Sequence, residues 1–246
     1  MISISAIKKR LRDLILGKKV MDASCAYDLW SVTYDKQTNN PIMFLDDILF
    51  NEMISNIKFG NKTVVDIGCG TGRQWELLLA KNPLEIIGYD VSKEMLNKLH
   101  QKFPEAKAYL MYNKDLKELK DASCDLIICN LVIGYIKDLP KTFIEWNRIL
   151  KKNGEIIITD FHPAALRKGA SRSFRNKQEV IYIRNYSHPL KRIKKITKKL
   201  GWHEINLFEK KVDETIKHFF EENNSVQVYE KNFNTPILYG YHFKRI

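Results

Sequence analysis

The sequence predicts an α/β fold in which a mostly parallel sheet carries helices on both faces. Two observations lead to this prediction. Between residues 63 and 160, runs rich in β-branched residues alternate with segments of helical apolar spacing, and parallel neighbours need a crossover of this kind. The chain has 246 residues, of which 44% are hydrophobic, so it can bury a sizeable core. One main domain is the simplest expectation.

The first quarter of the chain is predicted to contain two helices before the sheet begins at residue 63. Residues 2–16 place Ile4, Ile7, Leu11, Leu14 and Ile15 on one helical face, and Gly17 stands where that helix would end. Residues 42–54 again have helical apolar spacing. Thr63–Ile67 then forms a β-branched run that fits a buried strand.

Further elements follow in alternation. The expected strands cover residues 63–67, 85–89, 107–111, 124–129 and 154–160, and the expected helices cover residues 72–81, 92–102 and 140–151. Pro189 and Gly201 frame a helix over residues 189–200. Two late strands are expected, at residues 203–209 and 237–244.

Composition points to a cytoplasmic protein. The four cysteines, Cys25, Cys69, Cys124 and Cys129, form no CxxC pair and are expected to be reduced thiols. Charges interrupt the N-terminal segment, which excludes a secretory signal, and no stretch is apolar enough to span a membrane. No group of His, Cys and carboxylate residues has metal-ligand spacing, so no metal is expected.

The net charge of +12 is concentrated late in the chain. Residues 151–211 contain 16 Lys and Arg against 5 Asp and Glu, which gives 16 − 5 = +11. A basic field of this kind attracts acidic substrates, nucleic acid or anionic membranes. Such charge runs are, however, usually solvated surface.

A glycine-rich turn follows the first predicted strand. Thr63–Ile67 runs into Gly68-Cys69-Gly70-Thr71-Gly72 and then into a helical pattern. Glycines let the chain turn sharply and let a ligand approach the backbone. Asp66 precedes the turn, and Asp90 closes the next strand, where an acid can accept hydrogen bonds from ribose hydroxyls. The GxGxG spacing disfavours a nicotinamide enzyme, which has GxGxxG.

These residues resemble the class I S-adenosylmethionine (SAM) dependent methyltransferases, and in particular the small-molecule branch known as methyltransferase type 11. The resemblance is clear over residues 27–163. It implies a Rossmann-like sheet with an antiparallel late strand and, as cofactor, S-adenosyl-L-methionine, with S-adenosyl-L-homocysteine as its product. It also implies an N-terminal helical lid over residues 1–60, and a SAM-binding domain over 61–246 with a substrate-capping insertion at about 163–200.

The resemblance carries over to individual positions. The glycine turn would surround the amino-acid part of SAM, Asp90 would bind the ribose, and residues on the next segments would enclose the adenine. The cofactor-binding residues implied in this way are Asp66, Gly68, Cys69, Gly70, Gly72, Asp90, Val91, Met95, Asp115, Leu116 and Asn130. Three of them have an ordinary alternative, because Cys69 and Met95 also fit a buried core and Asp115 also fits an exposed loop.

The residues that contact the methyl acceptor are expected to come from the N-terminal lid, the segment after the fourth strand and the end of the fifth strand. The implied substrate-binding residues are Tyr27, Tyr34, Tyr135, Asp160, His162, Arg172, Phe174 and Tyr186, and the implied catalytic residues are His162, Tyr34 and Asp160. His162 could act as a base near neutral pH or be a structural histidine before a proline. Arg172 could pair with an anionic group.

Three functions compete on this evidence. The first is methyl transfer to an oxygen or nitrogen atom of a small molecule or a peptide-type natural product. The second is RNA methylation, with the basic 163–200 region as the contact surface: Lys191, Arg192, Lys194, Lys195, Lys198 and Lys199. The third is a SAM-binding partner without catalysis. The sequence sets neither the acceptor nor the oligomeric state.

Overall fold

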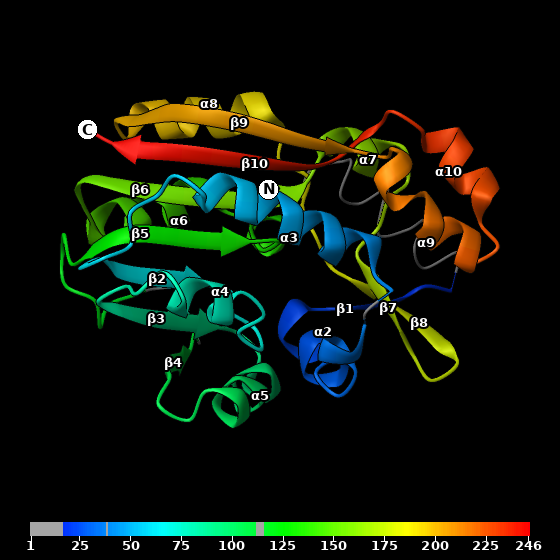
Figure 1. The fold of residues 1–246 in the computed structure, drawn as a ribbon, viewed down its shortest axis with the longest axis horizontal. Coiled ribbons are helices and arrows are strands. Elements are labelled where there is room, and N and C mark those ends of the chain that lie inside the picture. Colours follow the sequence, from blue (N-terminus) through cyan, green and yellow to red (C-terminus); the bar gives the residue numbers. More distant parts are fainter. Residues whose placement is uncertain (1–16, 38, 112–115) are drawn as a thin grey trace.

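The structure is a computed structural model that describes residues 17–37, 39–111 and 116–246. Figure 1 shows a sheet that runs through the middle of the molecule, with helices packed against it. The predicted helix over residues 2–16 and the predicted cofactor residue Asp115 lie outside the described residues.

The main sheet has seven strands in the order β4-β3-β2-β5-β6-β10-β9. Its strands are β2 (Thr63–Ile67), β3 (Glu85–Asp90), β4 (Lys107–Leu110), β5 (Cys124–Asn130), β6 (Leu150–Phe161), β9 (Trp202–Lys211) and β10 (Pro236–Arg245). The first five pair in parallel, and β10 runs antiparallel to both β6 and β9. The predicted α/β class, the mostly parallel sheet and the antiparallel late strand are therefore confirmed.

Each helix expected within the described residues is present, with some changed bounds. The helices around the main sheet are α3 (Pro41–Ile54), α4 (Trp75–Leu79), α5 (Lys93–Lys102), α6 (Leu139–Ile149), α7 (Pro163–Arg167) and α8 (Leu190–Lys199). The helix predicted from residue 72 begins only at Trp75, because Gly72 has a left-handed backbone (φ +73°) that a right-handed helix cannot contain. The strand predicted from residue 154 begins at Leu150, which pairs with Cys124 of β5.

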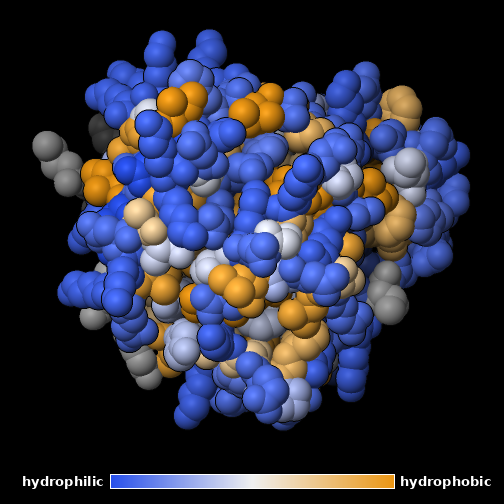
Figure 2. Space-filling model, turned by 60° about the vertical axis from the view of Figure 1, so that its left-hand side comes forward, coloured by the Kyte–Doolittle hydropathy of each residue, from blue (hydrophilic) through white to orange (hydrophobic). Residues whose placement is uncertain are grey.

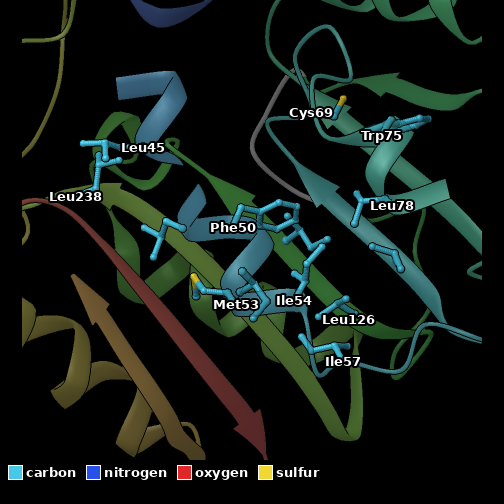
Figure 3. Close-up of a cluster of buried hydrophobic side chains, with 14 of the residues drawn as sticks. Leu45, Phe50, Met53, Ile54, Ile57, Cys69, Trp75, Leu78, Leu126 and Leu238 are labelled. Carbon is cyan, nitrogen blue, oxygen red and sulfur yellow. The ribbon is translucent and has the colours of Figure 1, made fainter. Parts of the chain in front are cut away.

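The sheet separates two apolar cores, and alternate residues of each strand point into opposite ones. Val64 of β2 packs with α3, α4 and α5, whereas its neighbour Val65 packs with α6 and α8. Figure 3 shows α3 side chains such as Phe50 and Met53 lying over the sheet in the first core. This three-layer arrangement fixes the positions of the strand ends on which the site is built.

A second, smaller sheet joins the N-terminal segment to the insertion after β6. It has the order β1-β8-β7, with β1 (Lys19–Met21), β8 (Glu179–Ile183) and β7 (Ser173–Asn176). The N-terminal segment continues with α2 (Ala23–Trp30) and the short 3-10 helix η1 (Tyr34–Lys36). Figure 1 shows these elements on the side to which the arrowheads of β2, β3 and β5 point.

Residues between β9 and β10 form short helices that the sequence patterns did not predict. They are η3 (Glu214–Ile216), α9 (Lys217–Glu222) and α10 (Val226–Asn232). Ile216, Phe219 and Tyr229 attach them to the core beneath α3. The remaining short 3-10 helix, η2 (Ile133–Tyr135), follows β5.

Hydrophilic residues cover most of the face seen in Figure 2, and hydrophobic residues appear in separate groups among them. Across residues 17–37, 39–111 and 116–246, no helix is both long enough and apolar enough to cross a membrane.

Candidate active site

A cavity of about 710 Å³ opens where the order of the main sheet reverses, between β2 and β5. Open α/β sheets bind ligands at such a switch point, outside the carboxyl ends of the strands. Its walls include Gly68 after β2, Asp90 at the end of β3 and Asn130 at the end of β5. The volume lies within the range of roughly 300–1,000 Å³ that holds small ligands and cofactors.

The glycine turn forms one wall of this cavity through its backbone. Gly68, Gly70 and Gly72 all have positive φ values, of +76°, +55° and +73°. A Cβ on Gly68 would lie 2.2 Å from Val132 Cγ2, whereas a Cβ on Gly70 would meet no atom within 4 Å, because that position faces the open cavity. A ligand can therefore approach the chain closely at Gly70.

Asp90 fastens the turn to the end of β3 and lines the cavity. Its Oδ2 accepts a hydrogen bond from Gly70 N at 2.8 Å, and its Oδ1 accepts one from Ser92 N at 2.8 Å. Burial raises the pKa of this carboxyl to about 6, against the lowering effect of these backbone hydrogen bonds. At pH 7 Asp90 is ionised, and each oxygen can still accept a further hydrogen bond.

Three of the predicted cofactor residues lie behind the turn and do not line the cavity. Asp66 accepts a hydrogen bond from Trp75 Nε1 at 2.8 Å, and burial raises its pKa to about 7. Cys69 is buried against Gly88, and Gly72 packs against Phe103. These three residues pack behind the glycine turn and are not among the described cavity walls.

The remaining predicted cofactor residues within the described chain line the cavity. Val91 and Leu116 join Met111 among the apolar residues that line the cavity and can enclose a flat ring. Met95 also lines the cavity, and it belongs to the same buried cluster as Trp30 and Phe174. Asn130 stands at the end of β5, and neither its side-chain oxygen nor its nitrogen has a hydrogen-bond partner within the described chain. Buried polar groups are normally paired, so Asn130 indicates that a polar ligand belongs here.

The other end of the cavity is aromatic. Tyr27, Trp30 and Tyr34 come from α2 and η1, and Tyr135 comes from the segment after β5. The hydroxyls of Tyr27 and Tyr135 are 2.9 Å apart, and the ring centroids of Trp30 and Tyr34 are 5.1 Å apart. Phe174, another predicted substrate residue, is absent from the described cavity walls but stacks on Trp30 from behind, with centroids 4.8 Å apart.

Asp160 and Arg172 form a buried ion pair beneath this aromatic end. Arg172 Nη2 donates to Asp160 Oδ1, and Arg172 Nη1 donates to Leu131 O at 3.0 Å. Asp160 also accepts from Gly134 N at 2.6 Å through Oδ2, and it is only 2% exposed. Asp160 was predicted to act in catalysis, but it does not line the described cavity, and Arg172 and two backbone N–H groups donate to its oxygens. Arg172 was predicted to bind an anion, and its charge is balanced by Asp160.

His162 lies away from the described cavity walls. Its Nδ1 accepts a hydrogen bond from Ala164 N at 3.1 Å, where it caps α7, and its Nε2 is 2.9 Å from Glu209 Oε1. Burial lowers the pKa of this imidazole. These contacts fit the structural role before a proline that the sequence also allowed for His162, since each ring nitrogen has a partner within the protein. Tyr34 and Tyr186, by contrast, do line the cavity.

The N-terminal segment is attached to the main domain beside the cofactor end. Asp28 of α2 accepts hydrogen bonds from Ser92 Oγ at 2.6 Å and Glu94 N at 3.1 Å, at the start of α5. Asp35 of η1 accepts from Thr71 Oγ1 at 2.6 Å, within the glycine turn. The turn that borders the cofactor end therefore also holds the segment that supplies the aromatic residues.

Sequence reasoning missed several cavity residues, among them Trp30, Asp22 and Arg184. The Nε1 of Trp30 is buried without a hydrogen-bond partner in the described structure. The sequence does carry a signal for Asp22, because an aspartate just before a helical apolar pattern is typical of a helix N-cap. No local signal identifies Arg184, since it reaches the cavity only through the pairing of β1 with β8.

Comparison with known proteins identifies the class of this domain. Residues 65–158 match the family model described as a methyltransferase domain. The chain is 29% identical to an uncharacterized protein of Haemophilus influenzae over 166 residues, which cover 62% of this chain and 65% of that protein. It is also 29% identical to malonyl-[acyl-carrier protein] O-methyltransferase of Legionella pneumophila over 46% of this chain and 40% of that one.

Solved structures share the fold. A SAM-dependent methyltransferase from Archaeoglobus fulgidus superposes with a TM-score of 0.64 at 16% identity, over 87% of this chain and 99% of that chain. At this identity the similarity describes the fold alone. The matches span less than two thirds of the length of the two relatives described above.

Proposed function

We propose that this chain, which belongs to the class I SAM-dependent methyltransferases, transfers a methyl group from SAM to an oxygen or nitrogen atom of a small molecule or a peptide-type natural product. The observation that carries the proposal is the pairing of two chemically different ends in one cavity. One end has the glycine backbone, an ionised Asp90 and the unpartnered Asn130. The other end is aromatic.

The residues at the first end fit the chemical groups of SAM. The open position at Gly70 admits an amino-acid group, and Asp90 has lone pairs for ribose hydroxyls. Met95 and Leu116 offer apolar contact for adenine, and Asn130 needs a polar partner. When bound, SAM supplies a methyl group on a positively charged sulfur, whose transfer requires an acceptor lone pair in line with that methyl.

The chain's own residues contribute positioning and exclusion of water. Tyr27, Trp30 and Tyr34 close over the cavity from the N-terminal segment, and Asp28 and Asp35 attach that segment to the cofactor end. Such enclosure holds an acceptor in line and keeps water out. The ionisable groups among the described cavity walls are Asp22, Asp90, Arg172, Arg184 and the four tyrosines. None of them is placed as a free base at the aromatic end.

The direct test is methyl transfer from SAM carrying a labelled methyl group. The purified full chain is incubated with candidate acceptors, and the products are identified by mass spectrometry together with any compound that co-purifies in the cavity. We expect labelled product and S-adenosylhomocysteine in equal amounts. Tight SAM binding without transfer to any acceptor class would favour the SAM-binding partner without catalysis.

RNA is the alternative acceptor, and the exposed cations of α8 are the feature that favours it. Lys191, Lys195, Lys198 and Lys199 are exposed, while Ile193 and Thr197 face the core. No α8 residue is among the described walls of the cavity. If the labelled methyl group were transferred to bulk RNA, and if exchanging these lysines for glutamine reduced that transfer, RNA would be favoured over a small-molecule acceptor.

Tyr34 provides a prediction about the aromatic end. Tyr34→Ala is expected to lower kcat by about 10- to 100-fold, because in-line positioning accounts for much of the rate of such a displacement. Tyr34→Phe should retain most of the turnover, since burial raises the hydroxyl pKa to about 12 and the group keeps its proton at neutral pH. Both variants should bind SAM nearly as the wild type does. A wild-type kcat for Tyr34→Ala would return Tyr34 to an ordinary packing role.

A further inference from the structure

One cation at the cavity is partly exposed and, among the described residues, its side chain pairs with one exposed acid. Arg184 follows β8, and its Nη1 is 2.8 Å from Asp22 Oδ1, which precedes α2. Both side chains line the cavity, and they are 39% and 63% exposed. An ion pair between exposed groups is weak, with a typical contribution of about 0–1 kcal/mol. Asp22 can therefore be displaced by a competing anion.

The other described cavity cation, Arg172, is much less exposed, although its Nε is buried without a hydrogen-bond partner among the described residues. Arg172 is only 3% exposed, and its guanidinium is engaged by Asp160 and by Leu131 O. It also lies over the rings of Tyr135 and Phe161, at 4.8 and 4.4 Å from their centroids. Withdrawing it for a ligand would leave Asp160 as a buried unpaired charge, which is strongly unfavourable. Arg184 is thus the more exposed of the two described cavity cations, and the one whose partner can be displaced without burying an unpaired charge.

Two serines line the same cavity as Arg184. Ile183 N donates to Arg172 O at 2.9 Å, so the β7–β8 ladder continues toward Ser171 and Arg184, and both line the cavity. Ser173 adds a second hydroxyl to the same wall. Arg184 N also donates to Met21 O at 2.8 Å, so its backbone stays fixed while the side chain exchanges partners.

We propose that the acceptor is a carboxylic acid, and that its carboxylate displaces Asp22 from Arg184 when it enters the cavity. This inference rests on the proposed methyltransferase function and adds the acceptor class and the residue that selects it. Asp22 then acts as a stand-in anion that neutralises Arg184 while the cavity is empty.

The chemistry of this step balances without a base. A lone pair on the carboxylate oxygen forms a bond to the methyl carbon, the carbon–sulfur bond breaks, and its electron pair stays on sulfur. The products are a methyl ester and S-adenosylhomocysteine, and no proton is moved. This agrees with an aromatic end that offers no free base among its described residues. The ester carries no charge, so Asp22 can return to Arg184 and release the product.

An amine acceptor fits these walls less well. A protonated amine must lose a proton before it can attack, and it needs a nearby acid to hold it. Asp90 belongs to the cofactor end, and Asp22 is already paired with Arg184. The net charge of +12 also favours the approach of anions over that of cations.

The test compares acids with their neutral analogues on the full chain saturated with S-adenosylhomocysteine. Calorimetry measures binding of benzoate, cinnamate and decanoate, and of the corresponding amides. Arg184→Gln is expected to weaken acid binding by about tenfold, the loss of one charge-assisted hydrogen bond at a partly exposed site. Asp22→Asn is expected to tighten it. The amides should respond to neither change.

Lys19→Gln is the matched control, because Lys19 pairs with Glu179 across the same two strands at 2.8 Å and neither residue lines the cavity. It should leave acid binding unchanged. With labelled SAM, the transferred methyl should be released as methanol by mild alkali, as expected for an ester.

Two groups of outcomes separate the inference from the function on which it rests. Absence of acid binding to the wild type, equal effects of Arg184→Gln on acids and amides, or weaker acid binding in Asp22→Asn would overturn the carboxylate assignment. Each of these can occur while SAM still binds and some other acceptor is methylated. Failure of SAM to bind would instead remove the methyltransferase proposal itself.

Discussion

Arg172→Met is expected to lower the free energy of unfolding by about 3–5 kcal/mol, the cost of leaving one partner of a buried ion pair without the other. Asp160 would keep the hydrogen bonds from Gly134 N and Phe161 N but lose its only cationic partner among the described residues. The guanidinium also packs over the rings of Tyr135 and Phe161, so its loss loosens the aromatic end of the cavity. Urea denaturation measures the change.

Two variants check this interpretation. Arg175→Met is the control, because Arg175 lies three residues further along, on β7, and is exposed. The double variant Arg172→Met/Asp160→Leu should regain part of the stability, since it removes both charges together. If Arg172→Met cost no more than Arg175→Met, the ion pair would not be a structural element, and Asp160 would again be a candidate for a catalytic role.

Asp90→Asn is expected to weaken SAM binding by about 10- to 150-fold, which corresponds to about 1.5–3 kcal/mol for charge-assisted hydrogen bonds. The carboxylate that lines the cavity would become an amide, and the acceptor for Gly70 N would change with it. Glu105→Gln, an exposed change outside the described cavity walls, is the control and should bind SAM as the wild type does. Calorimetry at pH 7.5 gives both affinities.

The same residue gives a pH dependence with a defined sign. Burial raises the pKa of Asp90 to about 6 in the unliganded protein, so the carboxylate is charged above that pH and becomes protonated as the pH falls through it. SAM affinity is expected to be full above about pH 7 and to decline below about pH 6. Asp90→Asn should remove this dependence. An equally steep decline in that variant would assign the titration to another group.

The centre of the main sheet could be predicted because β2, β5 and β6 contain β-branched runs, which are recognisable without long-range information. Thr63–Ile67 was predicted with the bounds that the structure shows. The β7–β8 hairpin was missed because its turn contains Lys177 in a left-handed conformation (φ +53°) where a glycine or asparagine would have signalled it. The helices α9 and α10 were missed because they are short and lie in a long connection.

The residues of the cofactor end could be predicted from the local spacing of the sequence, whereas those of the aromatic end could not. Gly70 and Asp90 belong to adjacent strand ends that the alternation itself brings together. Asp160 was expected to face the ligand because it lies at the end of a strand. Its side chain instead pairs with Arg172, and the sequence pattern gave no sign of this contact. Arg184 depends on a pairing between strands that are about 160 residues apart.

The most direct test of the account is calorimetric titration of the full chain with SAM and with S-adenosylhomocysteine. We expect both to bind one site with micromolar or tighter affinity, because the glycine turn, Asp90 and Asn130 line a single cavity of sufficient volume. Asp90→Asn run beside the wild type confirms that the heat arises at this site. A folded wild-type protein that binds neither compound would contradict the assignment of this cavity to SAM, and with it the proposed methyl transfer.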